Sequence, residues 1–123
     1  MDLEMNSLNE FELVLIETII KDNLDKFSFL QNHLEFLNVE TRKSNDFGVV
    51  VTFKYLKDFP EDEEFVNALL SAKSKLTIPR LKNELTYCLD ITNSKIDFLD
   101  ILTNEKELWD GNLNDAILTL EQS

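Results

Sequence analysis

Apolar side chains in the first third of the chain recur every three or four residues, which is the spacing of an amphipathic α-helix. Ser7 and Glu10 match a capping box, so a first helix is predicted to follow them and to run to about Lys21. After a short polar break, the same spacing predicts a second helix over residues 24–37. Because the link is short, we expect the two helices to form an antiparallel pair.

Later stretches are rich in β-branched and aromatic residues, which is typical of strands. Residues 47–55 give the strongest strand signal, and weaker ones cover residues 39–43 and 76–81. Gly48 indicates a bulge or a close approach of two chains. Residues 113–121 fit either a final strand or a short helix.

Residues 85–102 predict a β-hairpin that turns at Asn93 and Ser94, because two alternating apolar runs flank a pair of turn-forming residues. Strict alternation along the return strand would divide its side chains between two faces of the sheet. The expected sets are Ile96, Phe98, Asp100 and Leu102 on one face, and Asp97, Leu99 and Ile101 on the other.

An acidic run separates the strand at residues 47–55 from the hairpin. Asp58 as a cap, Pro60 in the first turn and the acids that follow predict a short third helix over residues 58–72. Four consecutive acids exceed what capping needs, so this run is the first candidate for contact with a basic surface. The four acids are Glu61, Asp62, Glu63 and Glu64.

These elements predict an α+β fold in a single domain over residues 1–123. Two antiparallel amino-terminal helices would pack on an antiparallel sheet of five or six strands, with the short third helix beside it. Antiparallel pairing is expected because the chain has hairpin turns and lacks repeated βαβ spacing.

The order of these elements, and several residues of the carboxy-terminal half, resemble a group of small bacterial α+β proteins. The matching residues are Ser94, Lys95, Ile96, Leu99, Asp100, Glu107 and Trp109. This sequence has Ser94 where the group usually has glycine, Asp100 where glutamate is usual, and Asp110 where proline is common. Many such proteins have no assigned function, and some similar ones are immunity partners of secreted bacterial toxins. The resemblance therefore implies a toxin-neutralising role.

Composition narrows the kinds of partner. Twelve Lys and Arg against 24 Asp and Glu give a net charge of −12, which repels nucleic acids and anionic membranes. The first residues are acidic and do not resemble a signal peptide, so a cytoplasmic location is expected. The single cysteine, Cys88, cannot form an internal disulfide and is expected to be a reduced thiol in the core.

No pattern of catalytic or metal-ligating residues emerges, so we expect neither an enzyme nor a cofactor. His33 is the only histidine and is expected to be structural. Residues 110–121 partly match a calcium loop, but Asp115 stands where that loop needs glycine. With two glycines in the chain there is no phosphate-binding loop. Trp109 is expected to anchor its loop on the core.

The function that these observations favour is an immunity or inhibitor protein that covers the basic site of a partner, such as a nuclease toxin. The second predicted contact patch consists of Asp97, Glu105, Glu107 and Asp110. Two alternatives stay open. The chain could self-associate as a homo-oligomer, or it could bind a small ligand in a concave pocket.

Overall fold

The computed structural model describes residues 7–57, 66–103 and 107–119. The chain forms, in order, α1 (Glu10–Lys21), α2 (Leu24–Phe27), the 3-10 helix η2 (Ser28–Phe36), β1 (Leu37–Ser44), β2 (Gly48–Tyr55), β3 (Ala68–Leu70), β4 (Lys75–Thr77), β5 (Thr86–Thr92), β6 (Lys95–Leu102) and β7 (Ile117–Thr119).

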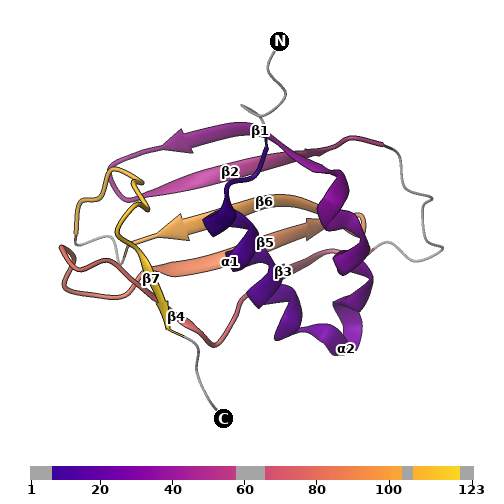
Figure 1. Cartoon of the computed structure of the whole chain (residues 1–123), viewed down its shortest axis with the longest axis horizontal. Helices are drawn as coiled ribbons and strands as arrows, with labels where there is room; N and C mark the ends of the chain where they lie inside the picture. Colours follow the sequence, from indigo (N-terminus) through magenta and orange to yellow (C-terminus); the bar gives the residue numbers. More distant parts are fainter. Residues whose placement is uncertain (1–6, 58–65, 104–106, 120–123) are drawn as a thin grey trace.

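Five strands make one antiparallel sheet in the order β1-β2-β6-β5-β3, while β4 pairs with β7 in a small separate sheet. Figure 1 shows α1, α2 and the small sheet on the same side of the large sheet. The described core lies between these layers and includes Leu15, Ile19, Leu89, Leu99 and Ile101, which are all fully buried. The predicted α+β fold is therefore confirmed.

Helix α1 is fixed at its start by a capping box, two residues later than predicted from Ser7 and Glu10. The Asn9 side chain accepts from the Glu12 N–H at 2.8 Å, and the Glu12 carboxylate accepts from the Asn9 N–H at 3.0 Å. The Glu12 carboxylate is buried and also accepts from Arg42 Nε at 2.7 Å and from Arg42 Nη2 at 2.8 Å. This two-pronged ion pair ties the helix to β1.

The second predicted helix, over residues 24–37, is replaced after its first turn by η2, and β1 already begins at Leu37. In a 3-10 helix, residues three apart lie on one face. Phe27, Leu30 and His33 have that spacing and are all buried. The tighter helix thus turns the histidine toward the core, which a regular α-helix with apolar positions alternating at three and four would not do.

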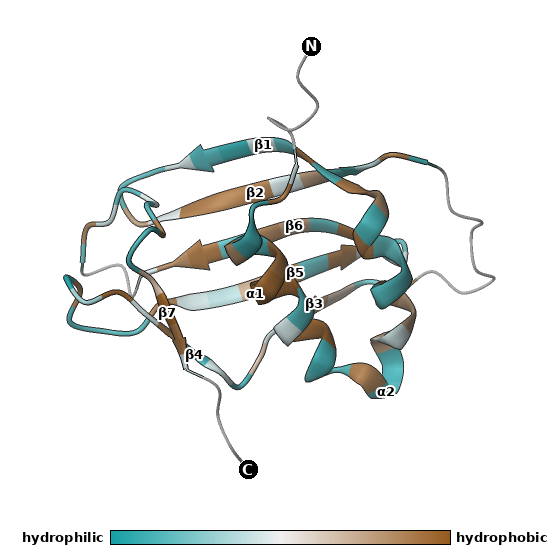
Figure 2. Ribbon diagram, viewed as in Figure 1, coloured by the Kyte–Doolittle hydropathy of each residue, from teal (hydrophilic) through white to brown (hydrophobic). Residues whose placement is uncertain are grey.

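Strand β1 is one of the two edge strands of the large sheet and is hydrophilic along most of its length, whereas β2 beside it is hydrophobic (Figure 2). The register of the pair shifts between Val39 and Thr41, which marks a bulge at this edge. Charged side chains and bulges on edge strands oppose unwanted pairing with other chains.

The predicted hairpin is present as β5 and β6, with its turn at Asn93 and Ser94. Both residues have positive φ, 52° and 64°, as a tight two-residue turn requires. The turn also docks on the segment before β3. The Ser94 Oγ accepts from the Val66 N–H at 3.0 Å, the Ser94 N–H donates to the Val66 carbonyl at 2.8 Å, and the Asn93 N–H donates to Asn67 Oδ1 at 2.9 Å.

A bulge interrupts the hairpin close to its turn. Ile91 pairs with Ile96 and Asp90 pairs with Phe98, so Asp97 has no partner across the ladder to β5. One extra residue on β6 reverses the alternation on either side of it.

The strict alternation predicted for the return strand is therefore wrong at Ile96, whereas it is confirmed for residues 98–102. The face toward α1 carries Ile96, Leu99 and Ile101, which are 2%, 0% and 0% exposed. The opposite face carries the partly buried residues Phe98, Asp100 and Leu102. The bulge is the reason that Ile96 joins the core instead of facing outward with Phe98.

Three other expectations need correction or completion. The helix predicted over residues 58–72 does not reach its expected end, because Ala68–Leu70 forms β3 and pairs with β5; residues 58–65 lie outside the described residues. The strand predicted at residues 76–81 stops at Thr77, two residues before Pro79, which has no N–H to donate. The ambiguous final segment contains strand β7.

Trp109 anchors its loop on the core, as predicted. It is 3% exposed, its Nε1 donates to the Asn112 carbonyl at 3.1 Å, and its N–H donates to the Asp46 carbonyl at 2.8 Å. The close approach predicted at Gly48 is also confirmed, because a Cβ at this position would collide with the carbonyl oxygen of Ile101.

The turn of the hairpin gives a test of this account. Ser94→Ala removes the acceptor of the Val66 N–H and keeps the strained φ, so we expect the free energy of unfolding to fall by about 1–2 kcal/mol. Ser94→Gly loses the same hydrogen bond but regains about 1 kcal/mol because glycine adopts positive φ without a steric cost. The free energy of unfolding measured in urea should therefore be highest for wild type, lower for Ser94→Gly and lowest for Ser94→Ala. A Ser94→Gly protein that is less stable than Ser94→Ala would contradict this interpretation of the turn.

Candidate functional site

The described helices and the small sheet leave uncovered the side of the large sheet that faces away from α1 (Figure 1), and its side chains are mostly half-buried. Cross-strand pairing places its side chains in rows that run over neighbouring strands. One row consists of Lys43, Val50, Asp100 and Cys88. The next row consists of Thr52, Phe98, Asp90 and Leu69. These two rows, together with Leu102, form the open face.

Asp100 lies near the middle of the open face, on the central strand β6. Val50 and Cys88 are its cross-strand neighbours, and Phe98 and Leu102 precede and follow it on the same face of β6. Its Oδ1 atom is shielded from solvent and has no hydrogen-bond partner among the described residues. One oxygen of the Asp100 carboxylate therefore lacks a hydrogen-bond donor from the described residues and lies among mainly apolar side chains. Such an arrangement lowers the stability of the folded protein unless a donor from another molecule pairs with the oxygen.

Burial shifts the pKa of two side chains in this row, Asp100 and Cys88. It raises the pKa of Asp100 above its ordinary value of 3.8. Burial also raises the pKa of the Cys88 thiol, and the negative charges of Asp100 and Asp90 add to that increase. Cys88 is half-buried on the open face, so the expectation of a core thiol was wrong, and its environment disfavours the reactive thiolate.

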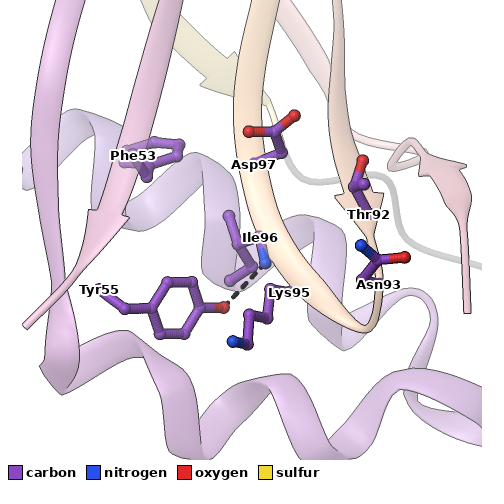
Figure 3. A pocket seen from close by; sticks show the side chains of 7 residues that line it. All are labelled: Phe53, Tyr55, Thr92, Asn93, Lys95, Ile96 and Asp97. Atoms are coloured by element: carbon purple, nitrogen blue, oxygen red, sulfur yellow. Dashed lines mark hydrogen bonds between the residues drawn. The ribbon is translucent and has the colours of Figure 1, made fainter. Parts of the chain in front are cut away.

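A concave pocket of about 420 Å³ lies at one end of the sheet, where β2 and β6 separate (Figure 3). The pairing of these two strands stops at Thr52 and Phe98, although both strands continue beyond that point. The pocket is lined by Phe53, Tyr55, Thr92, Asn93, Lys95, Ile96 and Asp97.

Tyr55 holds the two strands together across this opening. Its hydroxyl accepts from the Ile96 N–H at 2.8 Å and lies 2.7 Å from His33 Nδ1. Burial raises the pKa of Tyr55 to about 12, so the hydroxyl stays protonated at neutral pH. The ring of His33 stands edge-on to Tyr55 and to Phe29. His33 therefore has the structural role expected for it.

The acids predicted to contact a partner fall into three groups. Glu61, Asp62, Glu63, Glu64 and Glu105 lie outside the described residues. Two others already make contacts within the chain: Glu107 accepts hydrogen bonds from Lys82 and Asn83, and Asp110 accepts from Asn112 and faces Arg80 at 3.5 Å. Asp97 makes no hydrogen bond or ion pair with a described residue, and it lines the pocket. Their predicted role as contact residues stays a prediction.

The backbone hydrogen bond from Lys82 and the further donors of Asn83 lower the pKa of Glu107. This carboxylate closes the loop before β5 and is expected to remain charged over a wide pH range. Sequence reasoning did not select Asp100 as a partner-contact residue, although an acid between Leu99 and Ile101 in an apolar strand was a usable signal.

The described residues lack two further structural features. They contain no group of three or more His, Cys, Asp or Glu side chains arranged to hold a metal ion. Within the same residues, no helix has the length and apolar character that crossing a membrane requires.

Comparisons of the chain with protein-family models, with curated proteins and with solved structures find no match. The candidate site is therefore defined by its own geometry, which consists of the open face around Asp100 and the adjacent pocket between β2 and β6.

The raised pKa of Asp100 predicts how its replacement changes stability. The folded protein binds this proton more tightly than the unfolded chain does, so Asp100 lowers stability as pH rises from 3.8 through the raised pKa. We expect Asp100→Asn to increase the free energy of unfolding at neutral pH by about 0.5–1 kcal/mol, since the charge is only partly desolvated. The difference should vanish below pH 3.8, where both side chains are neutral.

Urea unfolding of the two proteins at both pH values measures this effect. Glu17→Gln is the matched control, because Glu17 is exposed on α1 and its charge should have little influence on stability. A clear loss of stability in Asp100→Asn at neutral pH would show that the carboxylate stabilises the fold, contrary to the account.

Proposed function

We propose that this protein is a non-enzymatic binding protein that neutralises a basic protein partner, such as a nuclease toxin, by covering the partner's basic site. The single observation that carries the proposal is the Asp100 carboxylate, which has an unpartnered oxygen in an apolar surround on the open face. The resemblance to small bacterial α+β proteins, some similar ones being immunity proteins of secreted toxin systems, also supports the proposal.

A cationic side chain of a partner would supply the counter-charge that the Asp100 carboxylate lacks among the described residues. A guanidinium or ammonium group could pair with the partly exposed carboxylate and offset its negative charge. Its aliphatic stem would lie against Phe98 and Leu102, which flank the carboxylate on β6. A charged group surrounded by apolar contacts, from which water is excluded once the complex forms, is the setting in which interface residues contribute most to affinity.

The net charge of the chain would influence the approach of the partner before the two proteins touch. At −12 the protein attracts a basic surface over several ångströms, which speeds encounter and makes association sensitive to salt. Asp90 on the open face adds to this field, and its Oδ1 is hydrogen-bonded to the Thr92 hydroxyl. Inhibition by covering a basic cleft needs no chemistry from the inhibitor.

The test is capture of a partner by tagged protein from its native cytosol and from cells that express the neighbouring reading frames. We expect a basic protein to be retained at low salt, to leave as salt rises, and to lose its activity when bound. Asp100→Asn should weaken the captured complex about ten-fold, because the partner's cation would lose its counter-charge.

Glu17→Gln removes one negative charge from α1, on the other side of the sheet, and should change affinity little. Neutralising Glu61, Asp62, Glu63 and Glu64 together tests the first predicted patch in the same assay. If no basic protein is retained at low salt, or if Asp100→Asn binds as tightly as wild type, the proposed surface is wrong. Retention of a second copy of the chain instead would favour the homo-oligomer.

A further inference from the structure

The pocket between β2 and β6 is a second candidate binding site, and its ligand can be inferred independently of the proposed protein partner. Beyond Thr52 and Phe98 the two strands separate, and the bulge at Asp97 increases the divergence because it bends the strand that contains it. Bulges are frequent beside binding sites, where they redirect a side chain. Here the redirected side chain is that of Asp97, which lines the pocket.

The floor of the pocket is apolar and is held in place before any ligand arrives. Phe53 and Ile96 are 5% and 2% exposed. Tyr55 is fixed from one side by the Ile96 N–H, as Figure 3 shows. On the other side its hydroxyl lies against His33 Nδ1. A rigid aromatic floor lowers the entropy that a ligand loses to protein rearrangement on binding.

Two opposite charges stand on this floor and do not pair with each other. Lys95 and Asp97 form no salt bridge with each other or with another described residue. In Figure 3 their side chains point in opposite directions along β6, with Lys95 beside Tyr55. The Lys95 Nζ atom lies 5.9 Å from the centre of the Tyr55 ring. The pocket thus has a cationic end and an anionic end separated by apolar side chains.

We infer that this pocket binds a small, elongated zwitterion, such as a short peptide with free ends, whose carboxylate meets Lys95 and whose ammonium meets Asp97. A ligand with one charge would be attracted by one of these residues and repelled by the other. A ligand with both charges gains from both, and its apolar body covers Tyr55 and Ile96. The volume of about 420 Å³ falls in the range of small-molecule sites.

A matched series of three ligands tests the inference with the intact chain. Leucyl-phenylalanine carries both charges, its N-acetyl derivative lacks the ammonium, and its carboxyl amide lacks the carboxylate. Titrations followed by amide NMR should show saturable shifts around residues 92–97 and the tightest binding for the free dipeptide. Each derivative should bind about ten-fold more weakly, because one charge-assisted hydrogen bond is lost.

Two variants assign each end of the ligand. Lys95→Gln should abolish the advantage of the free dipeptide over its amide, and Asp97→Asn should abolish its advantage over the N-acetyl form. Lys75→Gln, on β4 outside the pocket, is the control and should keep both preferences. Equal affinities of the three ligands for the wild-type protein, or no saturable shifts with any of them, would overturn the inference.

Discussion

The register of β6 is the constraint on which the rest of the structure depends. This strand lies in the middle of the sheet, between β2 and β5, so each of its side chains faces either the helices or the open face. The bulge at Asp97 determines that Ile96 faces the helices. Ile96 pairs with Ile91, whereas Phe98, two residues later, pairs with Asp90, the direct neighbour of Ile91. Without the extra residue, Ile96 would leave the core whenever Leu99 and Ile101 occupied it.

The two candidate binding regions follow from the same bulge. On one side of it, β6 carries Asp100 onto the open face among apolar neighbours. On the other side, the strand diverges from β2 and opens the pocket beside Tyr55. The carboxylates of Asp97 and Asp100 therefore serve different surfaces, although they are three residues apart. Both are left without a partner from the described part of the chain, one in a pocket and the other, through its Oδ1, on a flat face.

Local patterns in the sequence predict much of the fold. Helix α1, strand β2, the hairpin turn and the anchoring role of Trp109 each depend on a short, strong signal, and the structure confirms them. Other features depend on partners distant in sequence. Ala68–Leu70 has the composition of a helix but forms a strand because its backbone pairs with β5. The 3-10 helix η2 replaces an α-helix where His33 packs into the core.

The candidate site was harder to predict for the same reason. An acid in an apolar strand is visible in the sequence, but strict alternation also placed Ile96 on the face of Asp100. Only the cross-strand pairing shows that the bulge puts these two side chains on opposite faces. The pocket requires the separation of β2 and β6, two strands that are distant along the chain. The acidity of the chain is evident from composition, yet composition does not show that the Glu107 carboxylate is already hydrogen-bonded to a neighbouring loop.

We propose that the open face around Asp100 is a binding surface. Cys88 pairs with Asp100 across the ladder, and it is the only thiol in the chain, so its reactivity reports on that surface. The most direct measurement is the rate of Cys88 alkylation by N-ethylmaleimide, with and without the captured basic partner at saturation. We expect the partner to slow alkylation strongly at low salt, and we expect this protection to disappear at high salt. An alkylation rate unchanged by the bound partner would place the interface elsewhere and contradict the claim.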